Sequence, residues 1–203
     1  MKPGSGEDKI YNTWTKGKDT LLSPIISILL FLRIKPYMIT YGSIVSMILF
    51  FITLRTNITI AAVFLLITIL SDIFDGALAR KNKSCSDKGK FQDIVADNVN
   101  FSIFTFGIVY AGFLTGFWGM IIVYFMLLSK VLRIIFHSRE YSSDWWFKAI
   151  AGALPNVVVL LSVIAFFILL LGGYNVFNLI TPLLAGVLAI DSVFYFIRIV
   201  SQK

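Results

Sequence analysis

Four of the five aspartates in the stretch 71–100, SDIFDGALARKNKSCSDKGKFQDIVADNVN, form two closely spaced pairs. Asp72 and Asp75 are three residues apart, and Asp93 and Asp97 are four apart, so on helices each pair projects to one face. Carboxylate oxygens without His or Cys are the ligands of Mg²⁺, Mn²⁺ or Ca²⁺ rather than of zinc. The stretch therefore predicts a site for hard divalent cations, and four carboxylates are enough for two ions.

A simpler interpretation of these aspartates is that they cap helices or form solvated salt bridges with the basic residues of the connection between the pairs. The spacing favours a ligand site instead, because Gly76 and Ala79 share a helix face with the first pair. Such small side chains let a ligand or another backbone come close. Because Mg²⁺ commonly keeps positions open for phosphate oxygens, we expect a phosphorylated ligand.

The helices that must position these aspartates are expected to cross a membrane. Hydrophobic residues make up 58% of the chain and charged residues 14%, and the mean hydropathy is +0.85. Apolar windows of span length recur along the chain, and they predict an all-α integral membrane protein with six transmembrane helices at 36–54, 57–79, 94–117, 119–136, 149–171 and 177–200. The short connection makes the second and third spans antiparallel neighbours, which brings the four carboxylates to one depth.

The distribution of basic residues predicts the topology. All Lys and Arg residues except Arg55 fall in the N-terminal arm, in or near the connections after the second and fourth spans, and near the C-terminus. Short cytoplasmic segments hold most of the Lys and Arg residues of membrane proteins, so both termini and the acidic stretch are expected to face the cytoplasm. The net charge of +7 fits contact with anionic lipid or anionic substrates, and we do not expect nucleic acid as a partner.

The N-terminal segment 1–35 is predicted to be a cytoplasmic arm with an interfacial amphipathic helix in DTLLSPIISILLFLRIKP. A short extra span is the alternative, which Pro24 and Pro36 disfavour. Residues 36–203 would then form a single six-helix domain. No signal-peptide pattern opens the chain, so we expect the mature chain to start near Met1 and the protein to reside in a prokaryotic plasma membrane.

The acidic stretch resembles a family signature. The pattern D-x2-D-G-x2-A-R-x8-G-x3-D-x3-D of the CDP-alcohol phosphotransferases is met at every fixed position, by Asp72, Asp75, Gly76, Ala79, Arg80, Gly89, Asp93 and Asp97. The resemblance implies transfer of a phosphoalcohol group from a CDP-alcohol, in most members CDP-diacylglycerol or its archaeal ether counterpart, to a second alcohol. CMP is released, and the product is usually a phospholipid.

The resemblance also implies residue roles. Asp72, Asp75 and Asp93, with part of Asp97, would hold two Mg²⁺ or Mn²⁺ ions, and Asp97 would be the general base. The nucleotide and diphosphate would lie against Asp72 and Asp75 and against the remaining signature positions, Gly76, Ala79, Arg80 and Gly89. Related proteins form dimers, so a homodimer is expected.

The acceptor is less well specified by the sequence. Basic residues near the cytoplasmic ends of the last three spans are candidates to bind a phosphorylated acceptor, because Arg is suited to bidentate phosphate contacts; they are Arg133, Arg139, Lys148 and Arg198, with Lys130 in the same cluster. The alternative for each of these residues is that it binds no acceptor and only adds to the positive charge that is typical of the cytoplasmic side of membrane proteins. Asp191, inside the last span, is interpreted as an Arg-paired structural group rather than a pocket residue.

We therefore predict a metal-dependent CDP-alcohol phosphotransferase of phospholipid synthesis, with a phosphorylated polyol such as inositol phosphate or glycerol phosphate as acceptor. An unphosphorylated acceptor such as serine and a soluble CDP-polyol donor are the alternatives within this class. A divalent-cation transporter is the rival from another class, because intramembrane aspartates also line ion paths. The gathering of the acids at one membrane border argues against it.

Overall fold

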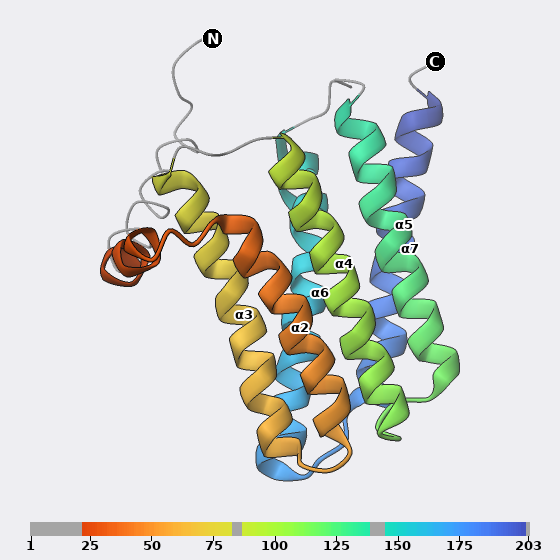
Figure 1. The fold of residues 1–203 in the computed structure, drawn as a ribbon. Coiled ribbons are helices and arrows are strands. Elements are labelled where there is room, and N and C mark those ends of the chain that lie inside the picture. Colours follow the sequence, from red (N-terminus) through yellow and green to blue (C-terminus); the bar gives the residue numbers. More distant parts are fainter. Residues whose placement is uncertain (1–21, 83–86, 139–144, 202–203) are drawn as a thin grey trace. The chain divides into compact units, whose positions relative to one another are not determined.

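The computed structural model describes residues 22–82, 87–138 and 145–201, and within these ranges it contains helices and no strands. The long helices are α2 (Pro36–Leu54), α3 (Ile58–Lys81), α4 (Asp87–Tyr110), α5 (Gly116–Ser138), α6 (Trp145–Gly172) and α7 (Phe177–Ser201) (Figure 1). A shorter apolar helix, Leu22–Phe31, precedes them. The predicted all-α architecture is confirmed.

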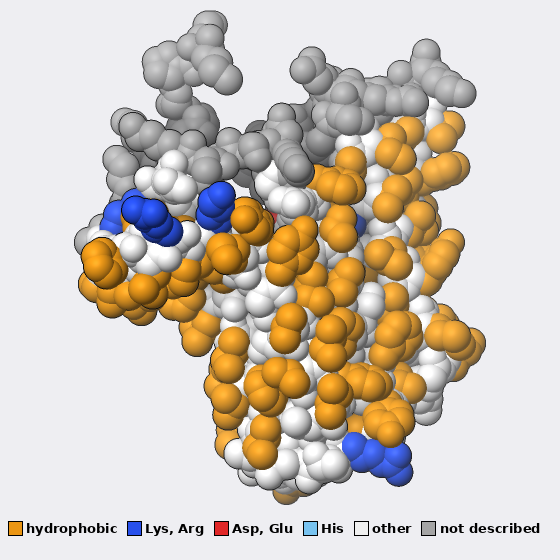
Figure 2. Space-filling model, in the orientation of Figure 1, with side chains coloured by type: hydrophobic (Ala, Val, Ile, Leu, Met, Phe, Trp, Pro, Cys, Tyr) orange, Lys and Arg blue, Asp and Glu red, His pale blue; other side chains and the backbone are white. Residues whose placement is uncertain are grey.

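Five of the long helices in the described part of the chain have the length and composition of membrane spans, with mean hydropathies from 1.8 to 2.8. The exception is α4, whose 24 residues reach about 36 Å at the usual helical rise but include the acidic and amide side chains of its first half. Exposed hydrophobic side chains follow the helices, as expected where the solvent is lipid (Figure 2). The chain is therefore an all-helical membrane protein in which α4 is the most polar long helix.

The predicted bounds of the third span are wrong at both ends, because α4 runs over 87–110 rather than 94–117. Its C-terminal end is set by Gly112, which has a φ of 83°. The Gly112 N–H donates to the Val109 carbonyl and the Phe113 N–H to the Ile108 carbonyl, at 2.9 and 3.0 Å. This pair of hydrogen bonds closes helices where a residue adopts the left-handed conformation. The apolar run continues through the turn, so hydropathy alone missed it.

Local sequence also explains where the first helices begin and end. Asn57 caps α3, because its side-chain oxygen accepts the backbone N–H groups two and three residues later, both at 3.0 Å. Arg33 has a φ of 55° and terminates the helix Leu22–Phe31. Pro36 then opens α2, a position where its missing N–H costs nothing.

The chain divides into two compact units, one of residues 1–46 and 65–96 and the other of residues 47–64 and 97–203. In the first unit, the helix Leu22–Phe31 buries Ile26 against Ala77 and Leu78 of α3. Its polar side chains are held there as well, because Lys81 Nζ donates to the hydroxyl oxygens of Ser23 and Ser27 at 3.2 and 3.0 Å. The short helix is thereby fixed to the end of α3, close in sequence to the acidic stretch.

The second unit has an aromatic and aliphatic core. Phe50, Phe104 and Phe166 are buried and pack ring to ring, with centroids 5.5 to 6.3 Å apart. Gly107 makes room for this cluster, because a Cβ there would lie 3.2 Å from the Phe50 ring. Along the rest of the unit α5 packs against α7 (Figure 1). This packing places Arg133 of α5 beside Asp191 of the last helix.

Candidate active site

Three of the four predicted carboxylates meet in the first unit. Asp72 and Asp75 project from α3 and Asp93 from α4, and one carboxylate oxygen of each lies within 4.8 Å of those of the other two. Asp75 is buried, at 7% exposure, whereas solvent reaches Asp72 and Asp93. The helical spacing and the short connection thus place two carboxylates of one helix beside one carboxylate of the next, as predicted.

This cluster fits an oxygen-liganded divalent ion. Mg²⁺ holds oxygens at about 2.0–2.1 Å and Ca²⁺ at about 2.3–2.6 Å, so two ligands of one ion lie at most about 4–5 Å apart. The three carboxylate oxygens satisfy the wider limit. Their charges would repel one another without a cation, so the donor set suits a hard divalent cation such as Mg²⁺, Mn²⁺ or Ca²⁺.

Thr40 orients the buried member of the cluster. Its hydroxyl donates a hydrogen bond of 2.8 Å to Asp75 Oδ2, and the Thr40 side chain is itself buried. A hydrogen bond to a charged group in a buried place is stronger than one in water. Thr40 therefore holds one oxygen of Asp75 in place. Sequence analysis did not single out Thr40, because it lies on α2 and no local spacing links it to Asp75.

The remaining signature positions lie along the same two helices. A Cβ at Gly76 would meet the Arg80 guanidinium at 3.4 Å, so the Arg80 side chain folds back over the glycine one turn earlier on α3. Ala79 is partly exposed on the same helix, and Gly89 is exposed in the first turn of α4. The helix that carries two of the carboxylates therefore also carries a cation, the kind of group that a diphosphate contacts.

Asp97 follows Asp93 by one turn on α4 and belongs to the second unit. Its carboxylate is 45% exposed and lies 3.7 Å from Lys130 Nζ of α5. An accessible carboxylate beside a cation can accept a proton from a bound hydroxyl. The pairing with Lys130 ties the basic cluster of α5 to a signature residue, which the sequence did not predict.

Arg133, one of the predicted acceptor residues, lies beside a buried carboxylate in the second unit. Its Nη2 is 3.9 Å from Asp191 Oδ2 of α7, and the Ser129 hydroxyl donates to the same oxygen. The guanidinium also lies 5.7 Å from the centre of the Tyr195 ring. Asp191 is only 2% exposed, so the interpretation of Asp191 as an Arg-paired group agrees with its contacts.

Replacing Asp191 with Leu is expected to lower the free energy of unfolding by about 3 kcal/mol, the low end of the range for buried ion pairs, because the Arg133 side chain loses its carboxylate but is itself 21% exposed. The double variant Asp191→Leu, Arg133→Met should recover most of this loss, since neither charge then remains. Reversible unfolding in detergent micelles measures both. If the single variant were as stable as the native chain, the pair would not support the α5–α7 contact.

The other predicted acceptor residues are placed only in part. Arg139 lies outside the described residues, and Lys148 stands in α6 with its side chain outside the described set. Arg198 is in the last turn of α7. The structure thus pairs Arg133 of α5 with the buried Asp191 of α7. The assignment of these four residues to an acceptor pocket stays a prediction.

The fold and site are those of a membrane-embedded protein with an acidic cluster suited to a divalent cation and phosphate chemistry. The sequence model of the CDP-alcohol phosphatidyltransferase family matches residues 33–195. This match covers most of the 203-residue chain, and the chain belongs to that family, as predicted. Comparison with curated proteins and with solved structures gave no match. The family supports transfer of a phosphoalcohol group from a CDP-alcohol in phospholipid synthesis.

Proposed function

We propose that this chain transfers a phosphatidyl-type group from CDP-diacylglycerol, or its archaeal ether equivalent, to the hydroxyl of a small phosphorylated polyol such as inositol phosphate or glycerol phosphate. The observation that carries the proposal is the convergence of Asp72, Asp75 and Asp93 in a chain of this family. Family membership also favours a transferase over the cation transporter that the carboxylates alone allowed.

The three carboxylates would hold one or both of the Mg²⁺ or Mn²⁺ ions. When bound there, such ions neutralise the diphosphate and make CMP a better leaving group. The residues themselves would hold the reacting groups in place. Thr40 fixes one oxygen of Asp75, and Arg80 would donate hydrogen bonds from its guanidinium to a phosphate oxygen. Gly76, Ala79 and Gly89 would let the cytidine and diphosphate approach the backbone.

Asp97 would accept the proton of the attacking hydroxyl. The acceptor oxygen forms a bond to the phosphorus that carries the lipid alcohol, the bond from that phosphorus to the bridging oxygen breaks, and CMP leaves with that oxygen. The proton passes to the Asp97 carboxylate, which is accessible and one turn from Asp93. This assignment requires the bound hydroxyl to come within hydrogen-bond reach of Asp97.

An acceptor phosphate would be bound by Arg133 and Arg198, with Arg139 and Lys148 as further contacts. The ion pair of Arg133 with Asp191, 3.9 Å apart, would restrict the guanidinium and so reduce the entropy lost when a phosphate binds. Serine, which has no phosphate, would need fewer of these cations. We further propose that residues 36–203 form the transferase domain of a homodimer in a prokaryotic plasma membrane, with the site facing the cytoplasm.

The proposal is tested by incubating detergent-purified protein with CDP-dioleoylglycerol, Mg²⁺ or Mn²⁺, and one acceptor at a time. Inositol phosphate, glycerol phosphate and serine are compared by CMP release and by the mass of the lipid product. We expect CMP release that depends on a phosphorylated acceptor. Faster transfer to serine would overturn the acceptor assignment, and CMP release only from a soluble CDP-polyol would overturn the lipid donor.

A further inference from the structure

Lys81, the last residue of α3, contacts the short helix Leu22–Phe31, which packs against this end of α3 (Figure 1). Its Nζ donates to the Ser23 and Ser27 hydroxyl oxygens at 3.2 and 3.0 Å and to the Ser23 carbonyl oxygen at 3.4 Å. The Ser27 hydroxyl donates its own hydrogen to the same carbonyl at 2.7 Å, which leaves its oxygen to accept from Lys81. An ammonium carries three N–H donors, so the short helix offers an acceptor for each of them.

The short helix supports α3 from behind the face that carries the signature residues. Ile26 of the short helix packs against Ala77 and Leu78, which are 1% and 0% exposed. At about 3.6 residues per turn, Ala77, Leu78 and Lys81 share one side of α3. Three signature residues of this stretch fall on the opposite side; they are Asp72, Gly76 and Ala79. Contact with the short helix therefore fixes the direction in which the signature face points.

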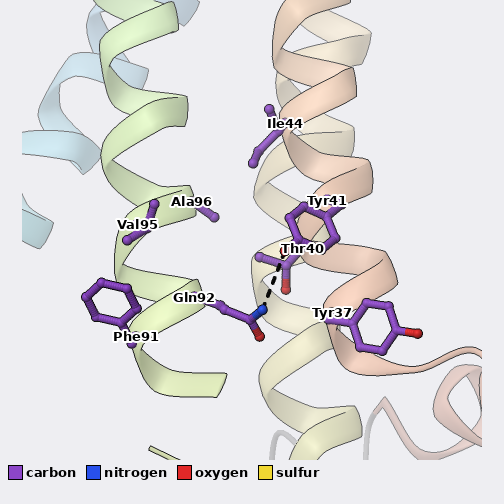
Figure 3. Close-up of a pocket in the computed structure, with 8 residues that line it drawn as sticks. All are labelled: Tyr37, Thr40, Tyr41, Ile44, Phe91, Gln92, Val95 and Ala96. Atoms are coloured by element: carbon purple, nitrogen blue, oxygen red, sulfur yellow. Dashed lines mark hydrogen bonds between the residues drawn. The ribbon is translucent and has the colours of Figure 1, made fainter. Parts of the chain in front are cut away.

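Contacts with α2 support the site at other points. Thr40 donates to Asp75 of α3 at 2.8 Å, and Gln92 of α4 donates to the Tyr41 hydroxyl at 3.4 Å (Figure 3). Arg80 lies more than one helical turn beyond Asp75, in the last turn of α3. Because the last turn of a helix lacks part of its backbone hydrogen bonds, it frays most readily. The contact with the short helix therefore supports a turn that lies beyond these contacts with α2.

We propose that Lys81 is a positioning residue of the donor site, which acts through the short helix to hold Arg80 toward the donor diphosphate. The inference rests on the proposed function and extends the donor site to an element that the sequence predicts only as interfacial. A Cβ at Gly76 would lie 3.4 Å from the Arg80 guanidinium, so the place of Arg80 over the signature face depends on the last turn staying helical. A group that is held in place before the substrate binds loses less entropy on binding.

The test breaks the same contact from its two ends. Lys81→Met removes the donor, and the double variant Ser23→Ala, Ser27→Ala removes the hydroxyl acceptors while the Lys81 charge stays. Lys81→Arg keeps a cation with donors for both hydroxyls. Lys35→Met is the matched control, because it removes an equal charge whose ammonium lies 5.9 Å from the centre of the Tyr37 ring. The KM values for CDP-dioleoylglycerol and for the phosphorylated acceptor are measured from CMP release by the full chain in detergent micelles.

Lys81→Met and the serine double variant should each raise the KM for the donor about tenfold, the effect of one hydrogen bond to a charged group, and leave the KM for the acceptor unchanged. Combining them should add little, since both remove the same contact. Lys81→Arg and Lys35→Met should keep the native KM for the donor.

The other outcomes separate the inference from the proposed function. A donor KM that rose in Lys81→Met but not in the serine double variant would overturn the inference, because Lys81 would then contact the diphosphate directly. Native values in both, or an equal rise in the KM for donor and acceptor, would overturn it as well. If the native chain itself released no CMP, the proposed function would be overturned instead.

A second readout does not depend on turnover. Hydrogen exchange of the full chain in detergent, followed by mass spectrometry, measures how often the last turn of α3 opens. Peptides that cover 76–81 should exchange faster in Lys81→Met and in the serine double variant, whereas peptides that cover 66–72 should keep the native rate. Unchanged exchange at 76–81 would overturn the inference even if the KM for the donor rose.

Discussion

Replacing Asp75 with Asn is expected to lower CMP release at least about 100-fold. The change removes one negative charge from the cluster with Asp72 and Asp93 while keeping the size of the side chain and an oxygen that accepts the Thr40 hydrogen bond. Bound metal ions contribute several kcal/mol of charge stabilisation to the transition state, and each 1.36 kcal/mol corresponds to about tenfold in rate. CMP release measured across a range of Mg²⁺ and Mn²⁺ concentrations shows the size of the loss and whether more metal restores activity.

Thr40→Val is the matched control for this experiment. It removes the hydrogen bond but leaves the Asp75 carboxylate, so its effect should be smaller, about tenfold if the bond has the usual strength of about 1.5 kcal/mol for a charged partner. A shift toward higher metal concentration in both variants is expected. If Asp75→Asn kept the native rate and metal dependence, these carboxylates would not be the ligands of a catalytic ion.

The Asp97→Asn variant should lower kcat by about 10²–10⁴, the usual contribution of a general base, with a smaller rise in the metal concentration that gives half-maximal activity than Asp75→Asn shows. This pattern differs from that of Asp75→Asn, because Asp97 would act on the acceptor proton. Asparagine cannot accept that proton at neutral pH. The measurement is a set of kcat and KM values for donor and acceptor with the native chain and the variant side by side.

The variant Lys130→Met separates the role of Asp97 as general base from its role in the ion pair with Lys130. The Lys130 ammonium lies 3.7 Å from the Asp97 carboxylate, which is 45% exposed, and such pairs contribute at most about 1 kcal/mol. The variant should therefore change kcat less than about fivefold. A native kcat in Asp97→Asn would exclude Asp97 as the base, whatever Lys130→Met does.

The acidic cluster was predictable because its geometry is local. Asp72 and Asp75 share a helix face by their spacing alone, and the short connection to α4 brings Asp93 beside them. Thr40 was not predictable in this way. Its contact with Asp75 joins residues 35 positions apart and depends on how α2 packs against α3, which no periodicity in the sequence encodes.

The same distinction applies to the rest of the fold. Hydropathy predicted the helices, because each long helix must satisfy its backbone hydrogen bonds internally, but it extended the third span past Gly112, where a left-handed residue ends α4. Asp191 could be predicted to pair with an arginine, because a carboxylate in an apolar helix needs a partner. That the partner is Arg133, with Ser129 on the same oxygen, follows only from the packing of α5 against α7.

The most direct test of the central claim is release of CMP from CDP-dioleoylglycerol by the purified protein, with and without acceptor, before and after metal removal by chelator. The proposed function requires CMP release that needs both the acceptor and the metal, returns when Mg²⁺ or Mn²⁺ is added back, and is lost in Asp75→Asn. CMP release that persisted in folded, metal-free protein, or that was unaffected by Asp75→Asn, would contradict a metal-dependent transferase centred on these carboxylates.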